Sequence, residues 1–218
     1  MAKEGNLEAP TRHALGWESP DFYNEEKCFD ELERIFDICH GCRRCVSLCN
    51  SFPTLFDLVD ESSTMEVDGV DKKDYWKVVD QCFMCDLCYM TKCPYTPPHE
   101  WNLDFPHTML RAKAIKFKKG EVGAAEKFLA STDTHGSFAG IPIVVLAINA
   151  INKTEAARSV MESVAGVDKN AWLPSLATKK FRSSAPDAQA SKVVDGEKTP
   201  GKVAIYSICY INYNEPGI

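Results

Sequence analysis

The chain has 218 residues, of which 44% are hydrophobic, and a formal net charge of -6. That length allows one or two domains with a real hydrophobic core, and the acidic balance argues against nucleic acid as a partner. Ten cysteines without an apolar N-terminal leader indicate a reducing, cytoplasmic compartment in which the thiols serve metal binding.

The first third of the chain predicts an arm followed by a helix. Residues 1–18 show no periodicity, and we expect an extended or poorly ordered arm there. From Glu25, apolar residues recur at helical spacing as far as Cys39, which predicts a helix leading into a cysteine-rich loop. Cys28 lies on the apolar stripe, so we expect a core thiol and not a ligand. Gly41 is expected to supply the backbone freedom for the tight loop.

Eight cysteines then stand in two runs, each with three thiols spaced by two residues and a fourth shortly after. The runs are Cys39, Cys42, Cys45 and Cys49, and Cys82, Cys85, Cys88 and Cys93. A [4Fe–4S] cubane needs a thiolate at each of its four iron corners. One short loop can reach three corners, and the fourth thiolate approaches from another side. The spacing therefore predicts two [4Fe–4S] clusters held by these eight thiols.

In two-cluster ferredoxins the fourth cysteine of each run binds the other cluster. Carried onto this chain, cluster I takes Cys39, Cys42, Cys45 and Cys93, and cluster II takes Cys82, Cys85, Cys88 and Cys49. The spacing alone leaves this division into fours open. Zinc is the alternative metal, but a zinc site usually takes separated pairs of cysteines, and a third evenly spaced cysteine is surplus for it.

The segment between the runs has helical character. Residues 52–59 predict a short helix packed over a cluster, and residues 60–74 form an acidic loop. A second helical stripe begins at Tyr75 and leads to Cys82, so that a helix followed by a cysteine loop occurs twice. This spacer favours a mainly α fold with an α-helical ferredoxin domain over residues 1–120.

After the second run, prolines stiffen the chain, and His99 is expected to be a packing residue and not a ligand. Asp104 and Gly120 bound a further predicted helix. Residues 121–182 are expected to form a helical extension. Its most apolar stretch, residues 138–151, is too short to span a bilayer and predicts a buried helix, with an interfacial or partner-facing segment as the alternative.

Residues 183–201 have the composition of a linker, and residues 202–208 predict a strand. Taken together, the two cysteine runs, the stretch 93–106 and the tail 210–216 resemble heterodisulfide-reductase-related iron–sulfur proteins, the group that includes the iron–sulfur subunit of anaerobic glycerol-3-phosphate dehydrogenase. The resemblance implies cysteine-rich domains after the ferredoxin domain. Residues 202–218 would then be the truncated start of one, with Cys209 as its first ligand.

Two features depart from the family pattern. Asn50 follows Cys49 where ferredoxins often have proline, and four residues, not three, separate Cys88 from Cys93. The second departure is expected to reshape the approach of that ligand without abolishing it.

The function expected from these patterns is electron transfer within an oxidoreductase complex. Two clusters would relay single electrons between a flavoprotein dehydrogenase or reductase subunit and a quinone or disulfide acceptor. The resemblance allows peripheral association with the inner face of the membrane through partner subunits. The alternatives are a zinc-stabilised interaction module and part of a catalytic disulfide reductase, which would need the missing C-terminal cysteines.

Charged residues next to the ligands suggest different potentials for the two clusters. Arg43, Arg44 and Lys92 lie beside the cysteines assigned to cluster I, and Asp86 lies within the loop of cluster II. Positive charge favours the reduced, more negative state of a cluster. We therefore expect cluster I to have the higher potential.

Overall fold

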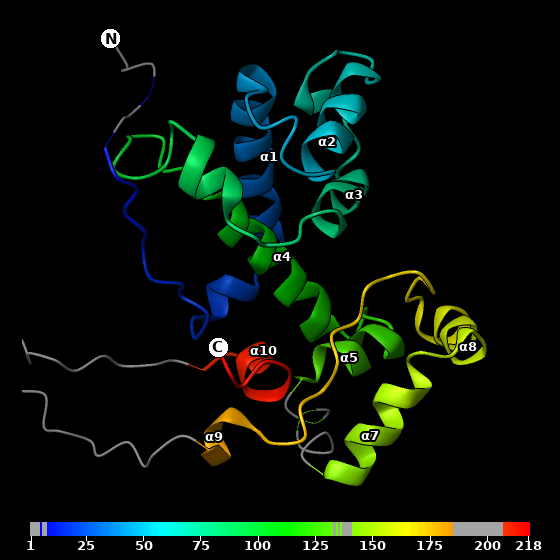
Figure 1. Cartoon of the computed structure of the whole chain (residues 1–218). Coiled ribbons are helices and arrows are strands. Elements are labelled where there is room, and N and C mark those ends of the chain that lie inside the picture. Colours follow the sequence, from blue (N-terminus) through cyan, green and yellow to red (C-terminus); the bar gives the residue numbers. More distant parts are fainter. Residues whose placement is uncertain (1–4, 6–7, 133, 135, 137–140, 185–206) are drawn as a thin grey trace, which may run out of the picture. The chain divides into compact units, whose positions relative to one another are not determined.

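The structure is a computed structural model that describes residues 5, 8–132, 134, 136, 141–184 and 207–218. The chain divides into two compact units, Met1–Glu121 and Val122–Ile218. Within the described residues every regular element is a helix (Figure 1), which confirms the mainly α class. In the same residues, no helix has both the length and the hydropathy needed to cross a membrane.

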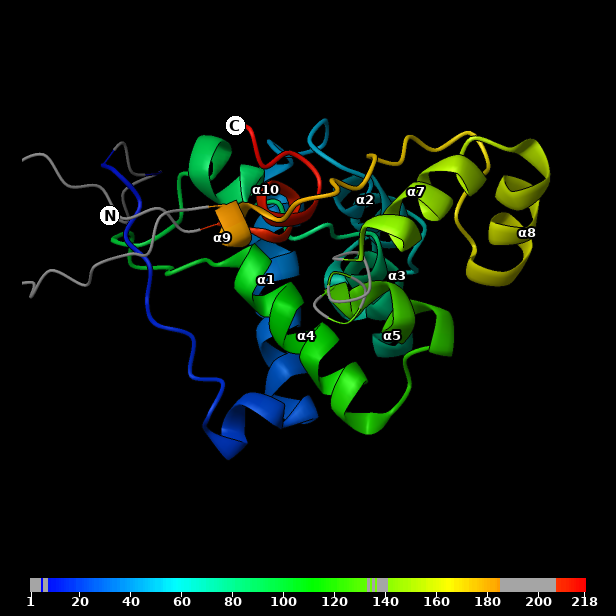
Figure 2. The same cartoon turned by 60° about the horizontal axis from the view of Figure 1, so that its bottom comes forward.

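The first unit is built on four α-helices around one core. They are α1 (Glu25–Cys42), α2 (Ser51–Asp60), α3 (Tyr75–Asp80) and α4 (Phe105–Lys119). A short 3₁₀ turn at Pro20–Tyr23 precedes α1, two more at Val67–Gly69 and Lys72–Asp74 lie between α2 and α3, and a π-helical turn, η4, spans Cys88–Lys92. Helix α1 lies beside α4 in both views (Figures 1 and 2), and α2 packs on α3.

Helix α1 has the apolar face that the sequence predicts. The Asn24 side chain accepts a hydrogen bond from the Lys27 amide at 2.9 Å and so caps the first turn. Four residues at helical spacing face the core: Cys28, Leu32, Ile35 and Phe36. The predicted burial of Cys28 is confirmed, because this side chain is 1% exposed, and burial raises the pKa of the thiol to about 11.

The end of α1 differs from the prediction. Gly41 is not the loop-opening residue, since α1 continues through it to Cys42. The left-handed residue that ends the helix is Arg43, with φ of 49°, and its amide donates to the Cys39 carbonyl at 2.8 Å. An ion pair with Asp60 on α2 holds the Arg43 side chain. The first two cysteines therefore lie on the last turn of a helix.

The first two cysteines of the second run, unlike those of the first run, do not lie on a helix. Helix α3 ends at Asp80, and residues 82–86 form no regular structure. Met84 and Asp86 both have left-handed backbones, with φ of 54° and 63°. The expected repeat of helix and cysteine loop thus holds for the order of elements but not for the local geometry of the thiols.

Helix α4 agrees with its predicted boundaries. The Asp104 side chain accepts a hydrogen bond from the His107 amide at 3.0 Å, and Gly120 ends the helix with φ of 80°. The same cap carboxylate also accepts hydrogen bonds from Arg12 of the N-terminal arm, so the start of α4 is joined to a distant segment of the chain.

The second unit contains α5 (Ala124–Ala130), α7 (Pro142–Ile151), α8 (Glu155–Ala165), α9 (Phe181–Ser184) and α10 (Cys209–Tyr213). Residues 138–140 of the predicted apolar helix lie outside the described residues. The expected burial of this helix is wrong: Val145 is buried, but Ile143 is 76% exposed and Leu146 is 61% exposed. Periodicity predicted a helix here, but a stretch that is apolar all round does not show which face, if any, is covered.

The C-terminal tail packs within the second unit. The Asn212 side chain is buried and accepts a hydrogen bond from the Arg182 amide at 3.0 Å. The Tyr213 carbonyl accepts from the Ala177 amide at 2.7 Å. Most of the predicted linker 183–201 and of the predicted strand 202–208 lies outside the described residues.

Candidate metal centre

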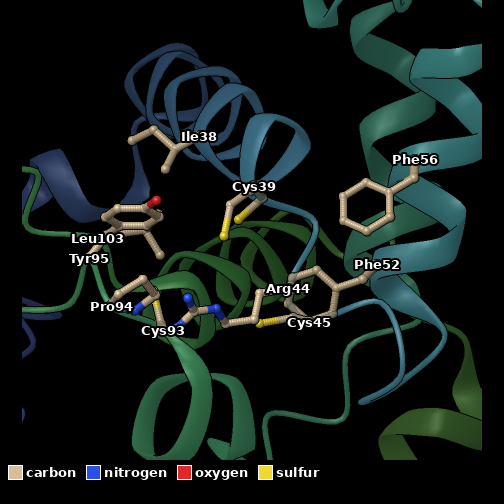
Figure 3. Close-up of a pocket in the computed structure, with 11 residues that line it drawn as sticks. Ile38, Cys39, Arg44, Cys45, Phe52, Phe56, Cys93, Pro94, Tyr95 and Leu103 are labelled. Atoms are coloured by element: carbon tan, nitrogen blue, oxygen red, sulfur yellow. The ribbon is translucent and has the colours of Figure 1, made fainter. Parts of the chain in front are cut away.

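A pocket in the first unit is lined by the four cysteines assigned to cluster I. They are Cys39, Cys42, Cys45 and Cys93. Figure 3 shows the residues that line this pocket, with Cys39, Cys45 and Cys93 labelled. Its walls are mostly apolar, with Ile38, Phe52, Phe56, Pro94 and Leu103 joined by Arg44 and Tyr95.

Three elements bring these thiols together. Cys39 and Cys42 occupy the last turn of α1, and Cys45 follows in the turn after it. Cys93 comes directly after η4, where its amide donates to the Cys88 carbonyl at 2.9 Å. Helix α2 supplies Phe52 on the opposite wall, as Figure 3 shows. The short helix predicted at residues 52–59 thus covers the cysteine pocket.

A second pocket shares three of those cysteines. It is lined by Cys39, Cys45 and Cys93 and adds Cys88 from the second run. The two runs therefore interleave in space.

The thiols of the second run also have neighbours from the first run. Burial, followed by nearby Cys49 and Cys85, raises the pKa of Cys82. Burial also raises the pKa of Cys88, and the neighbouring thiols that add to this effect are, in order, Cys45, Cys82, Cys49 and Cys93. Cys88 therefore has thiol neighbours from both runs. The first run's last cysteine, Cys49, thus lies among the thiols of the second run.

Cys93 lies among the thiols of the first run. Burial and then Cys93 are the two largest causes that raise the pKa of Cys39 well above its usual value. Backbone amides of Tyr95 and Thr96 donate toward the Cys93 sulfur and partly offset the effect of burial on its pKa. Cys49 and Cys93 thus each lie among thiols of the other run, as an exchange of fourth ligands requires, whereas Cys88 has neighbours from both runs. The division of the eight thiols into two fours stays a prediction.

The cysteines line a space and do not converge on one point. Among the described residues, no three His, Cys, Asp or Glu side chains are grouped closely enough to hold a single metal ion. A pocket with four thiols and mostly apolar walls has the donor set of a [4Fe–4S] cluster, whose irons each take one thiolate. Because bound thiols must be deprotonated, metal uptake by this pocket would release protons.

The two arginines of the first loop have different surroundings. Arg44 lines the pocket, where its charge lies near Cys93 (Figure 3). Arg43 forms an ion pair with Asp60, and its guanidinium lies 5.1 Å from the centre of the Phe56 ring. Sequence position alone treated the two as equivalent, but the structure leaves only Arg44 facing the thiols. The side chain of Lys92 lies outside the described part.

Tyr95 is a site residue that sequence reasoning missed. Burial and then the nearby Cys42 thiol raise the pKa of Tyr95, and its ring packs against His99 and Trp101 at 5.4 and 4.7 Å. His99 is buried and its Nδ1 accepts from the Trp101 amide at 3.1 Å, which confirms its predicted packing role. The sequence feature that could have identified Tyr95 as a site residue is its position directly after the Cys-Pro pair at positions 93–94.

Arg12 is a second residue that sequence reasoning missed. This arginine of the N-terminal arm binds Asp86, which the sequence placed in the loop of cluster II. The Arg12 guanidinium holds the pKa of Asp86 below its usual range. No local pattern connects two residues that are 74 positions apart.

Cys209 belongs to the second unit. It is exposed at the start of α10, and its thiol hydrogen-bonds the Thr132 hydroxyl at 3.6 Å. Its predicted role as a ligand of a further domain stays a prediction.

No protein-family model matches the chain, and no solved structure matches it. The chain is similar to citrate utilization protein B of Escherichia coli. The two are 28% identical over 83 residues, which make up 38% of this chain. The aligned segment spans 19% of the relative's length.

That similarity is distant and partial. It does not show that the chain belongs to the heterodisulfide-reductase-related family, so the resemblance drawn from the cysteine runs stays a prediction. The functional argument therefore depends on the cysteines and on what surrounds them.

Proposed function

We propose that this chain is an electron-transfer subunit that holds two [4Fe–4S] clusters. Cluster I is assigned to Cys39, Cys42, Cys45 and Cys93, and cluster II to Cys82, Cys85, Cys88 and Cys49. The observation that carries the proposal is the pocket that gathers four thiols from both cysteine runs between mostly apolar walls. Such walls keep water from a cluster, while the thiols supply its ligands.

The residues around the pocket account for binding and tuning. Each bound cluster would take up and release one electron at a time. Tyr95 and Arg44 place a hydroxyl and a positive charge near the thiols assigned to cluster I. We propose a flavoprotein dehydrogenase or reductase subunit as the redox partner and a quinone or disulfide as the acceptor. Any membrane association would then be peripheral and made through partners.

Metal and sulfide analysis tests the function. Anaerobically purified or reconstituted protein is expected to contain about eight iron and about eight sulfide per chain, with a brown visible spectrum. A Cys28→Ser/Cys209→Ser variant is the matched control and should keep the full iron content, because neither residue is assigned to a cluster. Colourless protein that retains zinc and no sulfide would overturn the proposal in favour of the zinc-stabilised interaction module.

Replacing Arg44 tests the electrostatic tuning of cluster I. Arg44→Gln removes a positive charge from the pocket wall, so the reduced cluster loses stabilisation and its midpoint potential should fall by on the order of tens of millivolts. Arg43→Gln is the matched control, and its shift should be much smaller because Asp60 already compensates that charge. The measurement is a redox titration followed by electron paramagnetic resonance. Equal shifts for both variants would contradict the assignment.

A further inference from the structure

Arg12 of the N-terminal arm holds two carboxylates at once. Its guanidinium makes two hydrogen bonds to Asp86, of 2.8 and 3.1 Å. It makes two more to Asp104, of 2.9 and 3.0 Å. Paired contacts between a guanidinium and a carboxylate are among the stronger hydrogen bonds in proteins, because they are charge-assisted and fixed in direction. One side chain thus joins the second cysteine run to the first turn of α4.

The arm around Arg12 is fixed independently. The Arg12 guanidinium stacks 4.1 Å from the centre of the Tyr89 ring, and the Tyr89 hydroxyl donates to the Thr11 carbonyl. The Thr11 amide donates to the Pro97 carbonyl at 2.9 Å. On the other side, His13 Nε2 lies 3.0 Å from the Asn102 side-chain oxygen. Residues 11–13 of the arm, which the sequence predicted to be extended or poorly ordered, are therefore held against the rest of the first unit by several contacts.

The loop that Arg12 holds needs external support. Residues 82–86 have no regular structure, and both Met84 and Asp86 have left-handed backbones. A left-handed conformation is tolerated by aspartate but is costly for a long side chain such as methionine. Such conformations persist where surrounding contacts determine them. Since Asp86 stands between Cys85 and Cys88, a contact that fixes Asp86 also fixes the direction of both thiols.

Arg12 also sets the charge beside this loop. Asp86 is only partly exposed, and Arg12 is the cation bound to it. The other charged groups packed around the guanidinium are Asp104 and, when protonated, His107, whose Nδ1 lies 3.1 Å from the Asp104 carboxylate. Removing Arg12 would leave the Asp86 carboxylate uncompensated next to the thiols assigned to cluster II.

We propose that Arg12 is a positioning residue for cluster II. It fixes the Cys85 and Cys88 thiols through Asp86, and it cancels the negative charge that Asp86 brings to that site. This inference rests on the proposed function, because it concerns a cluster at these thiols.

Three variants separate the two roles. Arg12→Gln removes both the charge and the paired hydrogen bonds. Arg12→Lys keeps the charge but cannot make paired contacts with both carboxylates. Arg12→Gln/Asp86→Asn restores the charge balance without restoring the paired hydrogen bonds from residue 12 to residues 86 and 104. The matched control is Arg34→Gln. Arg34 makes a paired contact with Glu31, at 2.8 and 2.7 Å, and its third hydrogen bond is to the Trp101 carbonyl and not to a residue of either cysteine run.

The readouts are the rate at which an iron chelator removes each cluster and the midpoint potential of each cluster. Arg12→Gln should lose cluster II about tenfold faster than the unsubstituted protein, as expected when charge-assisted hydrogen bonds are lost. Its cluster II potential should also fall relative to that of cluster I. Arg12→Lys should lose cluster II faster at a nearly unchanged potential. The double variant should recover the potential but not the chelator resistance.

Each outcome supports or overturns the inference. If Arg12→Gln behaves like Arg34→Gln in both readouts, the inference is wrong, and so it is if both clusters are lost equally fast. If Arg12→Gln does not fold, as judged by far-ultraviolet circular dichroism, the comparison of Arg12→Lys with Arg34→Gln decides on its own. Absence of iron and sulfide from the unsubstituted protein would instead overturn the proposed function, which keeps the two failures distinct.

Discussion

Cys93→Ala is expected to abolish cluster I and to leave cluster II in place. The variant should retain about four iron and four sulfide per chain, because a cubane that lacks one of its four thiolates is not stably held in this pocket. The reason for assigning Cys93 to cluster I is spatial. Its thiol lines the same pocket as Cys39, Cys42 and Cys45, although it belongs to the other cysteine run. Cys49→Ala should have the reverse effect and abolish cluster II.

Iron content alone does not show which cluster is lost, so pairs of substitutions are needed. Cys93→Ala/Cys42→Ala removes two ligands of the same proposed cluster and should still retain about four iron. Cys93→Ala/Cys85→Ala removes one ligand from each and should retain almost none. If each fourth cysteine instead served its own run, these two outcomes would be exchanged. The Cys28→Ala/Cys209→Ala variant should keep about eight iron and shows that loss of thiols is not itself damaging.

Local signals in the sequence were sufficient to locate the helices that carry the site. Asp104 and Gly120 bound α4 as predicted, because a cap side chain and a left-handed glycine act within one turn of the helix. The apolar spacing of α1 likewise predicted the burial of Cys28. These features depend on neighbours a few residues away, and a single sequence contains that information.

Features that depend on distant contacts could not be predicted in the same way. Sequence position made Arg43 equivalent to Arg44, and only the ion pair with Asp60 separates the two. Gly41 was the expected loop residue, but α1 continues through it and Arg43 takes the left-handed position instead. The hydrogen-bonded ion pair between Arg12 and Asp86 joins residues 74 positions apart, and no sequence pattern near either residue indicates it. Tertiary contacts decided the first and third of these points.

Leu32→Ala is expected to destabilise the first unit by about 3–5 kcal/mol. Leu32 is 0% exposed on the buried face of α1, so the substitution leaves a cavity that the surrounding helices fill only partly. Leu146→Ala is the matched control, because Leu146 is 61% exposed on α7 and should change stability by no more than about 0.5 kcal/mol. Anaerobic urea denaturation followed by circular dichroism measures both. Equal effects would contradict the packing described for α1.

The position of Leu32 links this loss of stability to the metal centre. Leu32 lies on α1 ahead of Cys39 and Cys42, which occupy the last turn of the same helix. A cavity under α1 should let that turn open more often, since local opening follows local stability. The thiols assigned to cluster II all lie outside α1, and the nearest of them in the chain is Cys49. A chelator should therefore remove cluster I from Leu32→Ala faster than cluster II, whereas a uniform increase for both clusters would show that only global unfolding exposes the iron.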